Sequence, residues 1–224
     1  MKNKLFLFLL ILVVTGAACK KDNMKAPSST ITGQVVFNKQ KLGLRSNGVQ
    51  LELWQRGFEL FSKIPVYVDQ DGTFSAKVFN GDYKLTLLRG NGPWADKTDT
   101  IDVSVNGSAD VEVNVDPYFL LNNAAFTRNA STINASFNLQ RINTSKDLEL
   151  VRIYIGQTII TDQNNNAGTA TKQAAAVDIT QPVALSINVP GSLAAKDYVF
   201  VRVAVKTKDV GELLYSEPVK VSLK

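Results

Sequence analysis

The segment 64–94 constrains the fold more than any other part of the sequence, because it contains two turn signals separated by alternating apolar residues. The pairs Asp71-Gly72 and Asn80-Gly81 supply residues that accept the positive φ of tight hairpin turns. Apolar side chains recur at every second position around these turns, which places one face of each strand in a core: Phe74, Ala76, Val78, Tyr83, Leu85 and Leu87. The segment therefore predicts two consecutive β-hairpins in an all-β protein.

The amino-terminal segment 1–18 has the pattern of a secretory signal peptide. A basic start precedes an apolar run over 5–14, which is too short for a membrane-spanning helix of about 20 apolar residues. Small residues followed by Cys19 resemble a bacterial lipoprotein signal, although Gly16 stands where leucine is usual. The resemblance implies that Cys19 is acylated after cleavage. The alternative is an ordinary signal peptide that contains a cysteine.

Residues 19–28 are polar, lack an apolar period and include Pro27, so we expect a flexible tether between the lipid and the first strand. We expect the protein to be anchored to the outer membrane, since more than one acyl chain gives stable anchoring. The charges at 20–22 loosely resemble a signal for export to the cell surface. They favour the surface, and the periplasmic face remains the alternative.

Composition excludes several classes of function. The chain has no histidine, which removes the commonest general base and the usual zinc ligand. Acylation of Cys19 leaves no thiol for a disulfide, a metal or a nucleophile. The net charge is +5 with scattered lysines and arginines, whereas nucleic-acid binding needs a clustered basic face. We therefore expect no enzyme activity, no cofactor and no nucleic-acid partner.

Residues 29–116 are expected to form the first of two tandem β-sandwich domains. Alternating apolar residues predict strands over 31–37 and 49–54, and Asn106-Gly107 predicts a third hairpin between 101 and 115. About seven strands with turns every 8 to 12 residues are typical of a sandwich.

The first domain resembles the carboxypeptidase-regulatory or transthyretin-like β-sandwich. Its pattern is a glycine in the first strand, an aspartate and glycine turn before an aromatic residue, and Gly-x-Tyr opening the next strand; here these are Gly33, Asp69, Asp71-Gly72, Phe74, Gly81 and Tyr83. Such domains are usually non-catalytic, so the resemblance implies an architecture more than an activity.

Residues 117–224 are expected to form the second sandwich, with a mobile polar loop over 162–173. The alternation over 198–221, interrupted by a turn at Gly211, resembles the last two strands of a fibronectin type III domain. In that family a tyrosine near the start of the penultimate strand anchors a corner through its hydroxyl, which implies this role for Tyr198. The usual core tryptophan is missing, and Phe137 is its best substitute.

The order of lipidated cysteine, tether, transthyretin-like domain and fibronectin-like domain resembles an uncharacterised lipoprotein family. Members of that family lie beside starch-utilisation-type glycan importers of the outer membrane. The motifs GVQLELWQ and IPVYVDQDGTF contribute to the resemblance. It implies capture or handling of a polysaccharide or oligosaccharide at the cell surface, with the transporter and other surface lipoproteins as partners.

Aspartates offer only weak candidates for chemistry. Asp69 and Asp71 have the spacing of the start of a calcium loop, but no later carboxylate continues it, so we expect a plain turn and no metal. Asp96, Asp99 and Asp102 lie three residues apart. A paired-carboxylate glycosidase needs two acids at a set separation in a cleft, which this spacing does not establish.

Aromatic residues are the better candidates, because a sugar ring stacks its apolar face on tryptophan or tyrosine. Trp54 is out of phase with Leu51 and Leu53, and Trp94 lies in a glycine-rich loop, so both are candidate platforms. The complete tentative ligand-binding set is Trp54, Phe58, Phe61, Asn91, Trp94 and Asp96, with Gln55 as a polar neighbour. The alternative is that the tryptophans are buried, covering an end of the sandwich or packing between domains.

Two functions therefore remain open. A glycan-binding accessory lipoprotein requires exposed tryptophans on one side of the molecule. A structural subunit that docks neighbouring surface proteins requires buried tryptophans and an exposed apolar patch.

Overall fold

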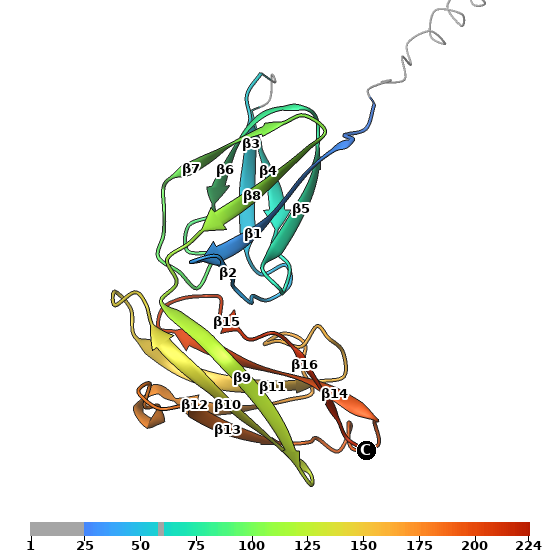
Figure 1. The fold of residues 1–224 in the computed structure, drawn as a ribbon, viewed down its shortest axis with the longest axis vertical. Helices are drawn as coiled ribbons and strands as arrows, with labels where there is room; N and C mark the ends of the chain where they lie inside the picture. The colour runs from blue at the N-terminus through green and yellow to red at the C-terminus, as the bar shows by residue number, and fades with distance from the viewer. Residues whose placement is uncertain (1–24, 58–60) are drawn as a thin grey trace, which may run out of the picture.

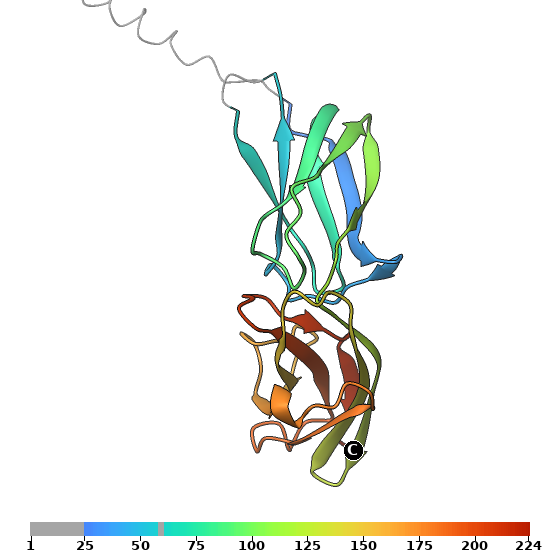
Figure 2. The same ribbon diagram turned by 90° about the vertical axis from the view of Figure 1, so that its left-hand side faces the viewer.

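The computed structural model describes residues 25–57 and 61–224, and nearly all regular elements in these ranges are β-strands. The strands form two sandwiches stacked end to end along the long axis of the molecule (Figures 1 and 2). No helix in the described ranges is long and apolar enough to cross a membrane. The predicted fold class of two tandem β-sandwiches is confirmed. The predicted signal peptide and Cys19 lie outside the described residues.

Two four-stranded sheets face each other in the amino-terminal domain. In the first, β1 pairs antiparallel with β5 and the short β2, and parallel with β8. The second has the order β4-β3-β6-β7. The strands are β1 (Ser29–Phe37), β2 (Gln40–Lys41), β3 (Gln50–Gln55), β4 (Lys63–Tyr67), β5 (Thr73–Val78), β6 (Gly81–Leu87), β7 (Thr100–Val105) and β8 (Ser108–Asn114).

The predicted alternation places the expected side chains in the core between these sheets. Leu51 and Leu53 of β3 and Leu85 of β6 are no more than 1% exposed. They belong to the same buried cluster as Ile31 and Val35 of β1. The residues between them in sequence consequently face the outer surface of the sheet.

The three predicted hairpins are wrong, although their turns and strands exist. Glycines with positive φ reverse the chain at Gly72, Gly81 and Gly107. However, β4, β6 and β7 belong to one sheet, whereas β5 and β8 belong to the other. Each turn therefore carries the chain across the core to the opposite sheet. Period-2 alternation determines which side of a strand is buried, but not which sheet the next strand joins.

The transthyretin-like pattern has a packing reason in this structure. Gly33 of β1 lies opposite Phe74 of β5, and a Cβ atom on Gly33 would lie 2.4 Å from the Phe74 ring and 2.2 Å from the carbonyl oxygen of Val111. Only glycine fits this approach. The buried Tyr83 hydroxyl donates a hydrogen bond to the carbonyl oxygen of Phe79 at 2.9 Å, which fixes the turn between β5 and β6.

The carboxy-terminal domain is an immunoglobulin-like sandwich. One sheet has the order β13-β10-β9, and the other has the order β12-β11-β14 with β15 and β16 both paired to β14. Phe137 lies in the core at 1% exposure, as predicted. The elements are β9 (Phe119–Asn129), β10 (Thr132–Arg141), β11 (Leu148–Gly156), β12 (Gly168–Gln173), η1 (Ala174–Ala176), β13 (Val183–Asn188), β14 (Tyr198–Thr207), β15 (Leu214–Tyr215) and β16 (Val219–Ser222).

Two expectations for this domain are wrong. Tyr198 is 40% exposed and packs edge-to-face on Phe200, with the Lys220 ammonium over its ring, so it anchors no corner. The expected mobile loop over 162–173 is instead ordered. Its second half is β12, and the buried Asp162 carboxylate accepts hydrogen bonds from two backbone N–H groups of its first half. The spacing of apolar residues in the sequence does not reveal hydrogen bonds of this kind between a polar side chain and the nearby backbone.

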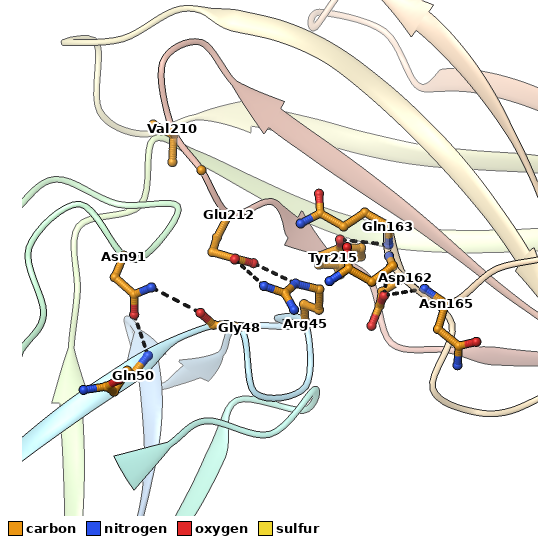
Figure 3. Close-up of polar contacts among 12 residues, drawn as sticks. Arg45, Gly48, Gln50, Asn91, Asp162, Gln163, Asn165, Val210, Glu212 and Tyr215 are labelled. Carbon is orange, nitrogen blue, oxygen red and sulfur yellow. Dashed lines mark hydrogen bonds and ion pairs between the residues drawn. The ribbon is translucent and has the colours of Figure 1, made fainter. Parts of the chain in front are cut away.

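A polar seam joins the two domains (Figure 3). Arg45, in the loop before β3, forms a two-pronged ion pair with Glu212, at 2.5 and 3.1 Å. Their side chains are only 18% and 12% exposed. The hydrogen bond to Glu212 is the largest cause that raises the pKa of Arg45.

The buried Arg202 of β14 forms a second link between the domains, in addition to the ion pair of Arg45 and Glu212. It donates hydrogen bonds to the carbonyl oxygens of Ser216 at 2.8 Å and, across the domain boundary, Leu44 at 3.0 Å. Its guanidinium lies 4.6 Å from the centroid of the Tyr215 ring. Burial lowers the pKa of Arg202 to about 10. The two domains are therefore joined by buried and partly buried polar contacts.

Candidate functional site

The outer face of the sheet β4-β3-β6-β7 presents one large aromatic side chain, Trp54. Because Leu51 and Leu53 face the core, the alternation of β3 turns Trp54 outward, and its side chain is half-buried there. Its cross-strand neighbours are Lys63 of β4 and Lys84 of β6. Neighbouring side chains on one sheet face lie about 5 Å apart, so the indole lies between two lysine stems.

Phe61 extends this aromatic surface. Its ring centroid lies 5.3 Å from that of Trp54 at an interplanar angle of 37°, and 54% of the residue is exposed. Phe58, which was predicted to join them, lies outside the described residues. Trp54 and Phe61 thus form a paired aromatic surface at the end of the amino-terminal domain remote from the domain junction.

A groove of about 320 Å³ lies beside Trp54 on the same sheet face. The Asp82 carboxylate at its edge accepts a hydrogen bond from the Ser104 hydroxyl at 2.7 Å, and Lys84 forms an ion pair with Asp102. The lining residues are Trp54, Arg56, Asp82, Tyr83, Lys84, Asp102, Val103 and Ser104. The two basic and two acidic side chains in the lining balance one another.

The side chains of this groove offer the kinds of contact that a sugar ring makes. An indole face binds the apolar face of a sugar ring, while carboxylates, hydroxyls and ammonium groups bond its hydroxyls. Asp82 and Asp102 are engaged with Ser104 and Lys84. A glycosidase would instead need one acid held protonated and another held free opposite it.

The remaining predicted site residues lie at the opposite end of the domain. β3 runs from Gln50 near the junction to Gln55 near the tip, and the Asn91 amide bonds the Gln50 N–H and the Gly48 carbonyl at 2.5 and 3.2 Å (Figure 3). Four residues of strand, about 13 Å, separate Gln50 from Trp54. Asn91 therefore holds the loop before β3 rather than joining the aromatic pair.

Trp94 is buried at 4% exposure, so it is not a solvent-facing platform, and the alternative that the tryptophans are buried is correct for this one. It pairs with Pro117 of the interdomain linker. Gly92 is required above its ring, because a Cβ atom there would lie 2.2 Å from the indole. Asp96 accepts a hydrogen bond from the Gly90 N–H at 2.8 Å, closing the same loop. Neither residue lies in the groove.

The turn containing Asp69 and Asp71 is a structural turn. The Asp71 carboxylate accepts hydrogen bonds from the backbone N–H and the hydroxyl of Thr73 at 3.1 and 2.7 Å. Partial burial alone raises the pKa of Asp71, but the bonds from Thr73 and the nearby Lys41 outweigh it, so the pKa lies below its usual value. Across residues 25–57 and 61–224, no three acidic, histidine or cysteine side chains gather as metal ligands.

Sequence reasoning missed the polar side of the groove. Asp82, Lys84 and Ser104 are ordinary outward positions of two strands, and nothing local distinguishes them. Their significance comes from register, since Trp54 lies opposite Lys84, and Lys84 lies opposite Asp102. Knowledge of the strand pairing is the one signal that would have identified them.

Comparison with known proteins places the chain in a family. The family model described as "Protein of unknown function (DUF3823) N-terminal domain" matches residues 29–116, and "Domain of unknown function (DUF3823_C)" matches residues 119–220. No curated protein matches the chain.

Three solved structures are similar over 88% of this chain and 100% of their own. DUF3823 family proteins from Bacteroides ovatus and Parabacteroides merdae are 35% and 33% identical, with TM-scores of 0.83 and 0.81. A "putative carbohydrate binding protein" from Bacteroides uniformis has a TM-score of 0.72 at 16% identity, which shows a common fold alone. The two family matches and the relatives at 35% and 33% identity show that this chain belongs to the DUF3823 family.

Proposed function

We propose that this protein is a non-catalytic glycan-binding lipoprotein that serves an outer-membrane import system, and that the groove beside Trp54 holds the glycan. The observation that carries the proposal is the Trp54 and Phe61 pair beside a groove edged by Asp82, Lys84 and Ser104. The name of the Bacteroides uniformis protein, which shares the fold, adds support.

The charge of the groove favours a neutral glycan. Arg56 and Lys84 are matched by Asp82 and Asp102 in the lining, and Lys84 is already paired with Asp102. A uronic acid or sulfate group would have to compete with these carboxylates for the cations. A neutral sugar accepts and donates hydrogen bonds without displacing an ion pair.

The position of the start of β1 suits a receptor that is tethered to the membrane at its amino terminus. β1 begins at the end of the domain that carries the groove, where the Ser29 hydroxyl bonds the side chain of Asn80 at 2.6 Å. In this proposal Cys19 carries the lipid, and residues 19–28 span at most about 35 Å. The groove then lies close to the membrane, within reach of a transporter channel, and the carboxy-terminal domain extends away from it.

Affinity electrophoresis of the mature chain tests the proposed glycan binding. Neutral polysaccharides such as amylopectin, xyloglucan and galactomannan are cast into the gel, with pectate as the acidic comparison. We expect retardation in at least one neutral gel, and loss of it in Trp54→Ala. The control is Tyr198→Ala, which removes an exposed aromatic residue from the other domain. Retardation of Trp54→Ala equal to that of the unmodified chain contradicts the proposal.

The second candidate function is a docking subunit that holds neighbouring surface proteins. The burial of Trp94 and the clamp formed by Arg45 and Glu212 favour it, because a rigid two-domain body suits a spacer. Pull-down of the tagged protein from its native membrane distinguishes the two. If the protein is a docking subunit, the Trp54→Ala variant still co-purifies with a transporter when no glycan is added. The unmodified protein then shows no retardation in any polysaccharide gel.

A further inference from the structure

A second cavity, separate from the groove beside Trp54, lies where the two domains meet. Its volume is about 320 Å³. One wall comes from β2 and the residues after it, and the other from the start of β9 and the segment from β15 to β16, which approach each other at the junction (Figure 1). Ligand sites occur preferentially at domain interfaces and occupy roughly 300 to 1,000 Å³.

The cavity has a fixed floor. Tyr215 of β15 pairs with Gly43 of the other domain, donating its N–H to the Gly43 carbonyl at 2.9 Å. A Cβ atom on Gly43 would lie 2.3 Å from the Tyr215 carbonyl oxygen, so the contact requires glycine. With Arg202 clamped on the Leu44 carbonyl beside it, the two walls are held at a set separation. The site is therefore pre-formed, which reduces the ordering cost of binding.

An irregularity in β9 lies in one wall. Asn122 pairs with Asn138 and Ala125 with Ser136, so two residues of β9 oppose a single residue of β10. This is a β-bulge, and Asn123 within it has φ +54°, an unfavourable value for a residue with a side chain. Bulges redirect side chains, and here Asn122 and Asn123 both line the cavity.

The lining is rich in side chains that both donate and accept hydrogen bonds. The Gln40 amide nitrogen donates a hydrogen bond to the Asn122 side-chain oxygen at 3.1 Å across the junction. This bond leaves the Gln40 side-chain oxygen as an acceptor and the Asn122 NH2 group as a donor for a ligand. Lys41 and Glu217 add one positive and one negative charge. Tyr215 is buried at 3% exposure and offers no ring face for stacking.

We propose that this junction cavity is a second binding site, which holds the hydroxyl-bearing end of a short neutral oligosaccharide. Paired amides match adjacent sugar hydroxyls, each of which donates and accepts. Without an aromatic platform, the cavity binds the edge of a terminal ring, whereas the groove at Trp54 binds a ring face. The ligand class follows from the lining itself; the proposed function only suggests sugars as the first probes.

The test is a ¹⁵N-¹H NMR titration of the mature chain with the trisaccharides maltotriose, cellotriose and mannotriose. We expect saturable shifts of the side-chain amide signals of Gln40, Asn122 and Asn123 with at least one of them. Asn122→Ala is expected to weaken this binding at least tenfold, as is Gln40→Ala at an exposed position of β2. The matched control Asn188→Ala, at an exposed asparagine of β13, leaves it unchanged.

The indole N–H signal of Trp54 reports the other site in the same spectra, so the two proposals fail separately. Shifts of the junction amides that persist in Trp54→Ala support the second site whatever happens at Trp54. The proposal is overturned if the trisaccharides leave the junction amides unshifted, or if Asn122→Ala and Gln40→Ala both bind as tightly as the unmodified chain. Well-dispersed spectra of the variants verify that they are folded.

Discussion

The ion pair between Arg45 and Glu212 makes the rigidity of the domain junction measurable. Two unit charges about 4 Å apart attract by about 4 kcal/mol at an effective dielectric constant near 20. Desolvation and side-chain ordering oppose this, and fully exposed pairs retain only about 0.2–1 kcal/mol. With exposures of 18% and 12% and two-pronged geometry, we expect a coupling free energy of about 1–3 kcal/mol.

A double-mutant cycle with Arg45→Ala, Glu212→Ala and the double variant measures that coupling from urea unfolding of the mature chain. We expect a single unfolding transition for the unmodified protein, because each domain leaves the other's buried polar groups unpaired when it unfolds. The coupling is expected to change little between 0.05 and 0.5 M salt, since partly buried pairs are weakly screened. A coupling free energy below about 0.5 kcal/mol, or two separate unfolding transitions in the unmodified protein, would contradict the claim that Arg45 and Glu212 hold the two domains together.

Three further predictions concern the amino-terminal domain. Gly33→Ala forces a methyl group against the Phe74 ring and is expected to lower the free energy of unfolding by about 1–3 kcal/mol or more, measured in urea. Tyr83→Phe removes a buried hydrogen bond to a backbone carbonyl and is expected to cost about 0.5–1.5 kcal/mol in the same assay, with an unchanged denaturant slope. The pKa of Asp71 is lower in the folded state than its ordinary value of 3.8. The contribution of the Asp71 carboxylate to the stability of the fold is therefore complete above pH 3.8, and it is lost as the pH falls through the folded-state pKa. Thermal melts should therefore show Asp71→Asn less stable than the unmodified protein at pH 6, with a gap that narrows below pH 3.8; a gap that is independent of pH would contradict this.

The fold could be predicted from sequence because burial follows alternation strand by strand. Leu51, Leu53 and Leu85 lie in the core where their period placed them. Sheet membership could not be predicted in this way. The glycine turns at Gly72 and Gly107 reverse the chain whether the next strand pairs with the previous one or crosses the core.

The candidate site was predictable only in part, for a related reason. Trp54 lies on a strand, and its phase relative to Leu53 correctly indicated the outer face. Trp94 and Asn91 lie in a loop with no period, and their positions are decided by Pro117 and Gly48, which are remote in sequence. The predicted site therefore combined residues from opposite ends of one domain: Trp54 lies near its tip, whereas Asn91 and Trp94 lie near the junction.

The central claim, that Trp54 contacts a neutral glycan, is tested most directly by iodide quenching of tryptophan fluorescence. The protein has two tryptophans, of which Trp94 is buried and Trp54 is half-buried on the groove. Iodide should quench the emission of Trp54, and a saturating neutral polysaccharide that retards the protein in a gel should remove this quenching. Trp54→Phe, which retains Trp94 alone, should resist iodide with or without glycan. Quenching that stays the same at saturating concentrations of every neutral polysaccharide tested would contradict the account.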